Sequence, residues 1–393
     1  MDSRLRPAPP LSAQYVQRAQ LRYFTTGDNH DYLADEILLL DQSEIDAALA
    51  AGDALFDTLR ATARRSFTDP RRRAELGVTD AMRPLLEWSL DNEWDDYYCG
   101  RFDFAGGFDE LPLSLLEFNA DTCSLLPETA VLQPELLRTA DLPPAHNELA
   151  AALQANARRL LRDGDDPDAV IGSHLGYEED RLNLHTQLSA FGAQLPIIQE
   201  LPHLIFDPDE GVLVELGPER FLRYDLLLKY FPWDFVATDE PELWGLLTEM
   251  ITTRRLRVLN PAWALLLQSK ALLVHAYQDD PNNPLLLPAA FRREDLPDPQ
   301  VGYVRKPLFG RTGDNVTLTL DGRTDTAARP GDYGHQPMIY QELAAFAMDF
   351  DQHRYQLSVF QAPRACALCC RRQDDFILDD DAEFVGLGVR RPY

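Results

Sequence analysis

Two short segments carry polar residues in a pattern that could bind a metal ion. Arg101 and Asp103 lie two residues apart in GRFDFA, and Glu117 and Asn119 lie two residues apart in LSLLEFN. Side chains alternate along a strand, so each pair would project from one face. Carboxylate and amide oxygens suit Mg²⁺, which commonly bridges protein carboxylates to phosphates. The alternative is a solvated polar face of an antiparallel sheet, and the spacing alone leaves both interpretations open.

The segment VRKPLFGRTGDNV has features of a phosphate-binding loop. Lys306 lies in the expected strand. The loop that follows contains Gly310 and Gly313, and Arg311 adds a second positive charge there. Glycines allow backbone N–H groups to approach phosphate oxygens closely. The spacing differs from that of the GxxxxGK[ST] loop, and many ordinary hairpins contain the same residues.

The segment MIYQEL could present a backbone edge to a nucleobase. It reads as an apolar strand that ends in Gln341 and Glu342, whose backbone groups could face an adenine edge. An ordinary core strand would have the same composition, and the segment by itself favours that alternative.

Lysine is scarce in this chain. Of 37 basic residues only three are lysines, at positions 229, 270 and 306. An ammonium group is a compact point charge on phosphate, which a guanidinium does not reproduce. Any one lysine could have been retained by chance, but Lys270 and Lys306 both lie in segments that have other features of a functional site.

The elements that would position these residues follow from hydrophobic spacing and turn signals. The two polar segments flank the turn at residues 106–109, which predicts a hairpin. Helices are expected at residues 11–94, 125–137, 149–161, 184–192, 242–255 and 261–277. Strands are expected at residues 169–173, 196–214, 302–308, 315–320, 338–343, 356–361 and 364–371, with a loop at 163–168. Regular βαβ alternation is absent from this pattern, so the expected class is α+β.

Composition excludes several classes of partner. The net charge of −27 disfavours nucleic acid and anionic membranes and tolerates a cationic substrate. No run approaches the roughly 18 apolar residues of a membrane span, and residues 1–12 lack a signal-peptide pattern. Cys366, Cys369 and Cys370 form a CxxCC pattern without a second pair, which favours buried strand residues over zinc. We therefore expect a cytoplasmic protein.

Six segments in the same order resemble the glutathionylspermidine synthase family of ATP-grasp ligases. They are GRFDF, LLEFNADTCSLLPE, EEDR, NPAWALLLQSKALL, VRKPLFGRTGDNV and IYQEL. The resemblance implies an ATP-grasp-like fold, with a pre-ATP-grasp, substrate- and metal-binding portion at residues 1–200 and a nucleotide-binding portion at 201–393. It also implies an ATP-dependent carboxylate–amine ligase that forms an amide through an acyl phosphate.

The resemblance implies a role for each matching position. Mg²⁺ would be held by Asp103, Glu117 and Asn119. ATP would be held by Lys270, Lys306, Gly310, Thr312, Gly313, Gln341 and Glu342. A small-molecule or peptide carboxylate would lie at Thr122 and Ser124, and an amine such as a polyamine would face Glu178 and Glu179. Catalytic charge would come from Arg101, Arg311 and Arg371. The role of Lys229 stays open.

The chain departs from the family pattern near its C-terminus. The family often ends in a segment like AGLGIRED, whereas CALCCR here keeps Arg371 but lacks both glycines. A second similar segment, GLGVR, ends at Arg390. We expect Arg371 to be the catalytic residue, because a strand-like segment at 375–378 continues the match.

Two alternatives to the ligase remain open. The altered segment would also suit an ATP-binding protein that has lost turnover, and a kinase would stop at phosphoryl transfer. The chain is too short to hold the Cys/His amidase domain of bifunctional members, so we expect no amide hydrolase activity. The sequence names neither substrate and does not give the oligomeric state.

Overall fold

The computed structural model describes residues 1–25, 31–161, 169–192, 196–298, 300, 302–320 and 326–390. Within these ranges the strands form four sheets, and helices and strands are mixed along the chain as expected. In the same ranges no helix combines the length and the apolar character needed to cross a bilayer.

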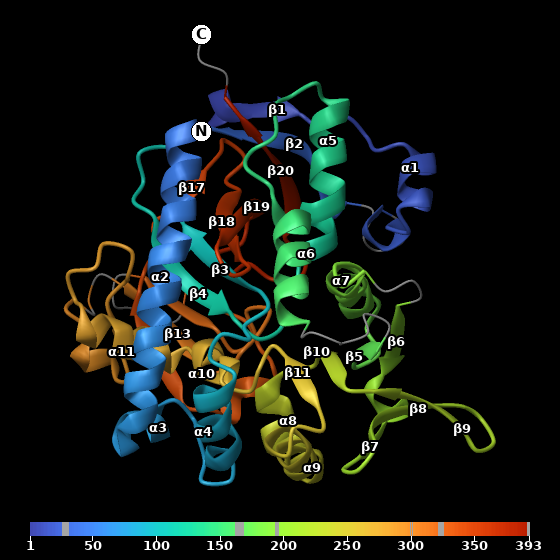
Figure 1. Cartoon of the computed structure of the whole chain (residues 1–393). Helices are drawn as coiled ribbons and strands as arrows, with labels where there is room; N and C mark the ends of the chain where they lie inside the picture. Colours follow the sequence, from blue (N-terminus) through green and yellow to red (C-terminus); the bar gives the residue numbers. More distant parts are fainter. Residues whose placement is uncertain are drawn as a thin grey trace.

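The largest sheet carries the candidate metal-binding hairpin. Its order is β1 (Leu5–Pro7), β2 (Leu33–Leu40), β20 (Glu383–Val389), β19 (Ala365–Gln373), β18 (Arg354–Gln361), β3 (Gly100–Ala105) and β4 (Ser114–Asn119), with β17 (Ala347–Met348) paired to β18. Figure 1 shows α2 (Gln42–Thr68) on one side of this sheet and α5 (Gln133–Thr139) and α6 (Leu149–Leu160) on the other. The sheet is therefore covered on both faces, and strands from both ends of the chain meet in it.

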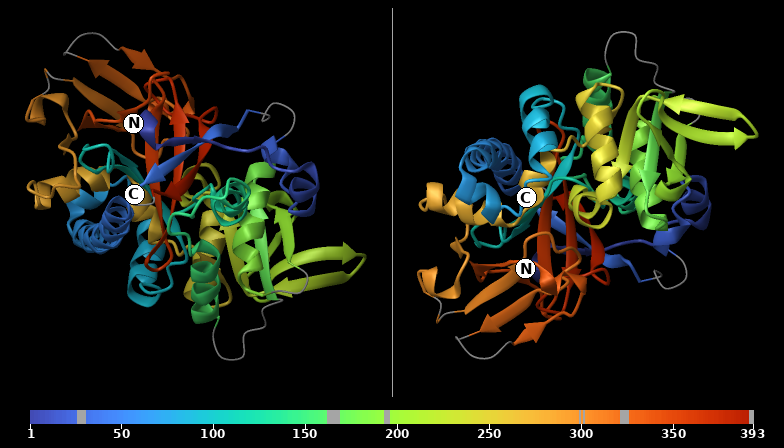
Figure 2. Two further views of the ribbon diagram at one scale, coloured as in Figure 1. Left: turned by 90° about the horizontal axis from the view of Figure 1, so that it is seen from above. Right: turned by 90° about the horizontal axis from the view of Figure 1, so that it is seen from below.

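Three smaller sheets surround it. A parallel sheet has the order β11 (Arg257–Leu259), β10 (Leu226–Tyr230), β5 (Val170–His174) and β6 (Ile197–Glu200). An antiparallel sheet has the order β12 (Ala289–Ala290), β16 (Met338–Glu342), β13 (Gly302–Pro307), β14 (Thr317–Leu320) and β15 (Ala327–Ala328). The last consists of β7 (Ile205–Asp207), β8 (Gly211–Gly217) and β9 (Arg220–Tyr224), and its hairpin projects from the body in Figures 1 and 2.

The remaining helices connect and cover these sheets. They are α1 (Ala13–Arg18), α3 (Pro70–Glu75), α4 (Arg83–Asn92), α7 (Glu178–Ser189), α8 (Trp233–Asp239), α9 (Pro241–Thr252), α10 (Ala264–Gln268) and α11 (Ala271–Asp279). The main hydrophobic core lies where α2 and α10 pack against the large sheet and α11 packs against α2, and it includes the buried side chains of Phe56, Leu357 and Leu266.

The expected hairpin is present as β3 and β4. Asp103 opposes Glu117, and Arg101 opposes Asn119, so both polar pairs share one face. The turn needs glycine: Gly106 has φ of 71°, and an added Cβ would lie 2.1 Å from a backbone oxygen. The pairing shifts by one residue between Asp103 and Phe104, where Leu116 is an extra residue in β4, and this shift brings Glu117 opposite Asp103.

The helix expected over residues 11–94 was wrong in part, because Leu33–Leu40 is strand β2. Its second half is a run of four apolar residues that pairs in parallel with β20 and is buried on both faces. Hydrophobic spacing cannot distinguish such a run from a buried helical segment. The glycines of GLGVR serve this packing: a Cβ at Gly388 would approach Leu39 to 2.8 Å.

Two further expectations need correction, and one lies outside the described residues. The helix expected at 261–277 is interrupted at Ser269 and Lys270, because the Lys270 N–H bonds to the Leu308 carbonyl across the fold instead of continuing the helix. Residues 375–378 lie in no strand; they form an irregular segment after β19. The loop expected at 163–168 falls in a stretch outside the described ranges.

Candidate active site

A cavity of about 440 Å³ lies between the large sheet and the antiparallel sheet of β12–β16. Its apolar lining includes Val304, Leu318, Leu343, Phe346 and Ile377. The expected nucleotide-binding residues also line it: Lys270, Lys306, Gly310, Arg311, Thr312, Gly313, Gln341 and Glu342, together with Glu117. The structure thus brings together residues that are up to 260 positions apart in the sequence, and it places an apolar wall beside a cluster of positive charge.

Lys306 is buried at the wall of this cavity. Its Nζ donates to the Leu116 carbonyl at 3.1 Å and to Gln341 Oε1 at 2.8 Å. Gln341 in turn donates to the Leu115 carbonyl at 3.2 Å, so β13, β16 and β4 are joined at this point. Burial lowers the pKa of Lys306 to about 8, although the nearby Glu117 carboxylate opposes the shift.

Lys270 lies beside the expected metal ligand Glu117. Its Nζ donates to the Gly310 carbonyl at 2.6 Å and lies 3.0 Å from Glu117 Oε2. Lys270 lies at the interruption between α10 and α11, and its side chain reaches the loop that contains Gly310. Burial would raise the pKa of Glu117, but Lys270 and Lys306 outweigh it and hold that pKa at about 2.

Arg101 and Asp103 form a buried bidentate ion pair. Arg101 Nε and Nη2 donate to the two Asp103 oxygens at 2.7 and 2.9 Å. Asn119 and Ser358 add hydrogen bonds to the same carboxylate at 2.9 and 2.7 Å. Arg101 Nη1 reaches the other way, to the backbone and hydroxyl oxygens of Ser124 at 2.9 and 3.0 Å. The guanidinium therefore links the metal-ligand candidates to a carboxylate-site candidate.

The three metal-ligand candidates differ in how they could accept Mg²⁺. Glu117 faces the cavity, and its Oε1 has only a long 3.4 Å contact with the Asn119 amide. Asp103 is 2% exposed and already accepts four hydrogen bonds. The described residues contain no cluster of three or more His, Cys, Asp or Glu side chains suited to a metal. With two carboxylates and one amide as protein ligands, Mg²⁺ would fit here only if water and phosphate oxygens completed its coordination.

The other expected substrate residues are placed less uniformly. Thr122 is half-buried just past the end of β4. Glu178 begins α7, where Arg181 binds it at 2.6 Å and both side chains are exposed. Glu179 interacts electrostatically with Arg371 and Arg101: burial raises the pKa of Glu179, and these two positive charges act against that shift.

Sequence reasoning did not single out Glu128, which lies in the matching segment LLPE. Its Oε1 accepts the Tyr32 hydroxyl at 2.6 Å, while its Oε2 is buried without a partner among the described residues. Burial and the neighbouring Glu179 raise the pKa of Glu128 to about 7. Glu128 and Glu179 therefore form an acidic region beside Arg371.

Strand register places Arg371 on the face that carries Asp103. Arg371 opposes Gln356, and Gln356 is two residues from Ser358, the hydrogen-bond partner of Asp103. Alternate residues of a strand share a face, so these side chains point to the same side of the sheet. The Arg371 guanidinium donates to the Asp379 carbonyl, and its Nε is buried without a partner among the described residues.

The other candidate, Arg390, lies elsewhere. It binds Asp41, at the start of α2, at 2.7 and 2.5 Å. In the altered segment CALCCR, residues 367–371 pair with β18, and the register shifts at Cys366. Cys366, Cys369 and Cys370 are buried strand residues, as expected. Alanine and cysteine thus replace the family's glycines without interrupting the strand.

The family of this chain follows from comparison with known proteins. The model of the family "Glutathionylspermidine synthase preATP-grasp" matches residues 4–390. The chain belongs to this family. A putative acid–amine ligase of Haemophilus influenzae is 28% identical over 323 residues, which are 78% of this chain and 78% of that protein. Trypanothione synthetase of Crithidia fasciculata is 25% identical over 317 residues, which are 75% of this chain and 47% of that protein.

The chain therefore spans about half the length of the trypanothione synthetase. Among solved structures, a glutathione synthetase-like effector of Globodera pallida, in its apo form, superposes with a TM-score of 0.54 at 10% identity. The match covers 98% of this chain and 100% of the other, and it shows a glutathione synthetase-like fold. The expected family is confirmed, and the expected class, an ATP-dependent ligase that forms carbon–nitrogen bonds, agrees with the names of its relatives.

Proposed function

We propose that this chain is an ATP-dependent carboxylate–amine ligase with an ATP-grasp type of nucleotide site. The observation that carries the proposal is the convergence of Lys270, Lys306 and Glu117 on one cavity, beside the Arg101–Asp103 pair. Residues 201–393 would supply most of the nucleotide contacts, and residues 1–200 the metal and substrate contacts. Strands from both portions share the large sheet, so they would act as one unit.

The cavity has the chemistry that a nucleotide requires. Its apolar lining suits a base, and Gln341 and Glu342 line the same cavity. Lys270, Lys306 and Arg311 would neutralise phosphate charge. When bound, Mg²⁺ would add positive charge on the phosphates, held by Glu117 and Asn119 and, if its hydrogen bonds rearrange, by Asp103.

The remaining residues suit the two halves of the reaction. A carboxylate held at Ser124 and Arg101 would attack the γ-phosphorus of ATP, releasing ADP and leaving an acyl phosphate. The amine would then attack the acyl carbon, and phosphate would leave with the carboxylate oxygen. Arg311 and Arg371 would stabilise the charge that spreads over the transferring group. Because Glu178 is bound by Arg181, we place a cationic amine nearer to Glu179.

We propose a small-molecule or peptide carboxylate and an amine, a polyamine included, as substrates. The charge of −27 favours a cationic amine over nucleic acid or an anionic membrane. The five cysteines are free and buried, which suits the reducing cytoplasm.

A coupled assay tests the proposed activity. The protein is incubated with ATP, Mg²⁺ and a library of carboxylates and amines, while ADP and product mass are followed. A ligase releases ADP only when both substrates are present, and the product is the sum of the two less one water. ADP release with a phosphorylated product would indicate a kinase, and nucleotide binding without ADP would indicate an impaired ATP-binding protein.

Lys306→Arg should lower activity by about 10²-fold, as expected for loss of one well-placed phosphate contact. The Lys306 ammonium fits between the Leu116 carbonyl and Gln341 and is 8% exposed, so a guanidinium cannot occupy that space without displacing neighbours. The comparison is made by ADP release, with Arg305→Lys on the same strand as the control. A fully active Lys306→Arg would show that the scarcity of lysine is a coincidence.

ATP affinity should fall as the pH rises above about 8. In the free protein burial lowers the pKa of Lys306 to about 8, whereas bound phosphate would raise it. Below that pH the ammonium is already formed and affinity is constant; above it, binding requires proton uptake and weakens by up to about tenfold per pH unit. Calorimetric titration in two buffers would detect the uptake. Affinity that is constant from about pH 7 to about pH 9.5 would contradict the assignment.

A further inference from the structure

Arg311, in the glycine loop at residues 310–313, is bound by side chains that lie outside this loop. Arg311 forms a direct ion pair with Asp234, the second residue of α8, and Arg311 Nη1 donates to the Tyr333 hydroxyl at 3.4 Å. The Asp234 side chain is only 7% exposed. The next loop residues, Thr312 and Gly313, have left-handed φ values of 52° and 75°, and the loop lines the cavity. The position of Arg311 over the cavity therefore depends on where α8 begins.

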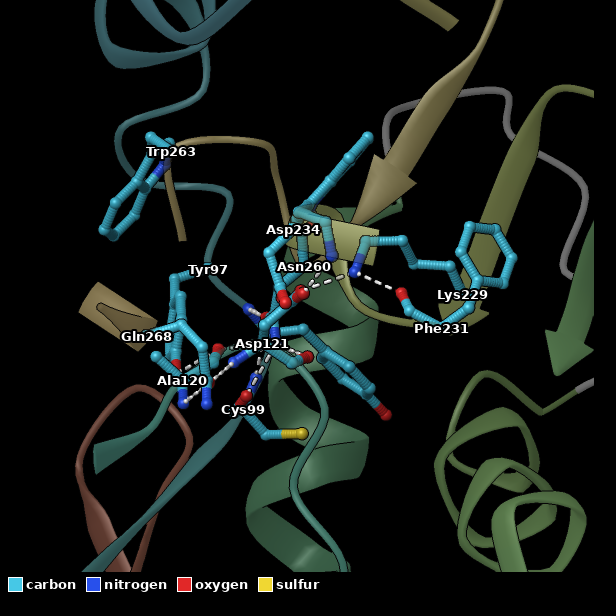
Figure 3. Close-up of polar contacts among 12 residues, drawn as sticks. Tyr97, Cys99, Ala120, Asp121, Lys229, Phe231, Asp234, Asn260, Trp263 and Gln268 are labelled. Atoms are coloured by element: carbon cyan, nitrogen blue, oxygen red, sulfur yellow. Dashed lines mark hydrogen bonds and ion pairs between the residues drawn. The ribbon is translucent and has the colours of Figure 1, made fainter. Parts of the chain in front are cut away.

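The start of α8 is fixed by a buried ion pair. The Trp233 N–H donates to Asp121 Oδ2 at 2.7 Å, and the other oxygen of Asp121 pairs with Lys229. Lys229 Nζ also donates to the Phe231 carbonyl at 3.0 Å, and its side chain is completely buried. Figure 3 shows Asp121 and Lys229 pointing toward each other, with Asp234 beside them. Sequence analysis had left Lys229 without a role.

Asp121 is itself tied to the strand that carries Glu117. It lies two residues past Asn119, and its backbone N–H donates to Gln268 Oε1 at 3.1 Å. Asn260 Nδ2 donates to the Asp121 carbonyl at 3.0 Å (Figure 3). Removal of either partner of the Asp121–Lys229 pair would leave the other charge buried without compensation. An unbroken series of contacts leads from the end of β4 through Asp121 and α8 to Arg311.

We propose that Asp234 is a positioning residue, which orients Arg311 toward the transferring phosphoryl group with the buried Asp121–Lys229 pair as its anchor. The inference rests on the proposed function, in which Arg311 contacts phosphate. A free arginine side chain loses rotational freedom when it binds, and a partner that fixes its orientation beforehand removes part of that cost. If Asp234 acted only through its negative charge, its removal would instead strengthen the binding of the anionic nucleotide. The two effects are therefore separable by kinetics.

The kinetic test uses Asp234→Asn in the full chain, with both substrates saturating. We expect kcat to fall by about tenfold or more, because misplacement by about 1 Å can cost up to 10²-fold, and the KM for ATP to change little. Asp234→Glu should recover part of the rate. Because Asp234 acts through Arg311, Arg311→Ala combined with Asp234→Asn should be no slower than Arg311→Ala alone. Asp239→Asn, exposed at the other end of α8, is the matched control.

A second measurement is independent of turnover. Trypsin cleavage after Arg311, followed by mass spectrometry without nucleotide, should be several times faster in Asp234→Asn and unchanged in Asp239→Asn, with thermal unfolding showing that both variants are folded. Unchanged cleavage, additive effects in the double variant, or tighter ATP binding at an unchanged kcat would each overturn the positioning role. If the wild-type protein forms no amide, the proposed function fails, and the cleavage rates still decide whether Asp234 holds Arg311.

Discussion

Glu117→Gln should reduce ADP release by about 10³-fold or more while the protein stays folded. The carboxylate faces the cavity and has a pKa of about 2, so it is fully ionised at neutral pH. Glutamine keeps the shape but removes the charge that Mg²⁺ needs. It also leaves Lys270, 3.0 Å away, without its anionic partner. ADP release at saturating substrates measures the effect, and circular dichroism with thermal unfolding checks the fold.

The matched control for this experiment is Glu242→Gln. Glu242 is exposed in the first turn of α9, remote from the cavity-lining residues in sequence, and should retain wild-type turnover. Normal ADP release by Glu117→Gln would show that the metal assignment is wrong. Loss of activity in both variants would point to an effect on folding rather than to Mg²⁺.

Arg371→Ala should lower kcat by about 10² to 10³-fold with little change in the KM for ATP. An arginine that stabilises the transferring phosphoryl group interacts most strongly in the transition state, so its loss affects rate more than binding. The structure supports this choice, because Arg371 shares a face with Asp103 and has a buried Nε without a partner among the described residues. Initial rates over a range of ATP concentrations separate the two constants.

Arg390→Ala is the built-in comparison for Arg371. Arg390 binds Asp41 at the start of α2, so its removal should leave turnover nearly unchanged and affect only stability. The reverse pattern would move the catalytic arginine to the C-terminal segment. Wild-type rates in both variants would mean that neither arginine is catalytic.

The sequence predicted the parts of the site that local structure determines. The hairpin of Arg101, Asp103, Glu117 and Asn119 could be predicted from its glycine turn and its two alternating strands. Its register could not, because Glu117 opposes Asp103 only through an extra residue, Leu116, in β4. Lys306 and its glycine loop were likewise recognisable from one continuous segment. The resemblance to the family then supplied roles that spacing alone left open, and the family itself is confirmed.

Long-range contacts decide the features that the sequence did not reveal. The apolar run of β2 pairs with β1 on one side and with β20, more than 340 residues away, on the other. The interruption at Lys270 depends on a hydrogen bond to Leu308, and no proline or glycine marks it. The ion pairs Lys229–Asp121 and Arg311–Asp234 join residues 108 and 77 positions apart, so spacing in the sequence gives no signal for them.

An oxygen-isotope experiment tests the central claim most directly. A carboxylate substrate labelled with ¹⁸O is incubated with the amine, ATP and Mg²⁺, and the released phosphate is analysed by mass spectrometry. If the carboxylate attacks the γ-phosphorus and the amine then displaces phosphate, one carboxylate oxygen must leave in the phosphate. We predict one ¹⁸O in the inorganic phosphate for each amide formed. Amide formation with unlabelled phosphate, or ADP release without amide, would contradict an acyl-phosphate ligase.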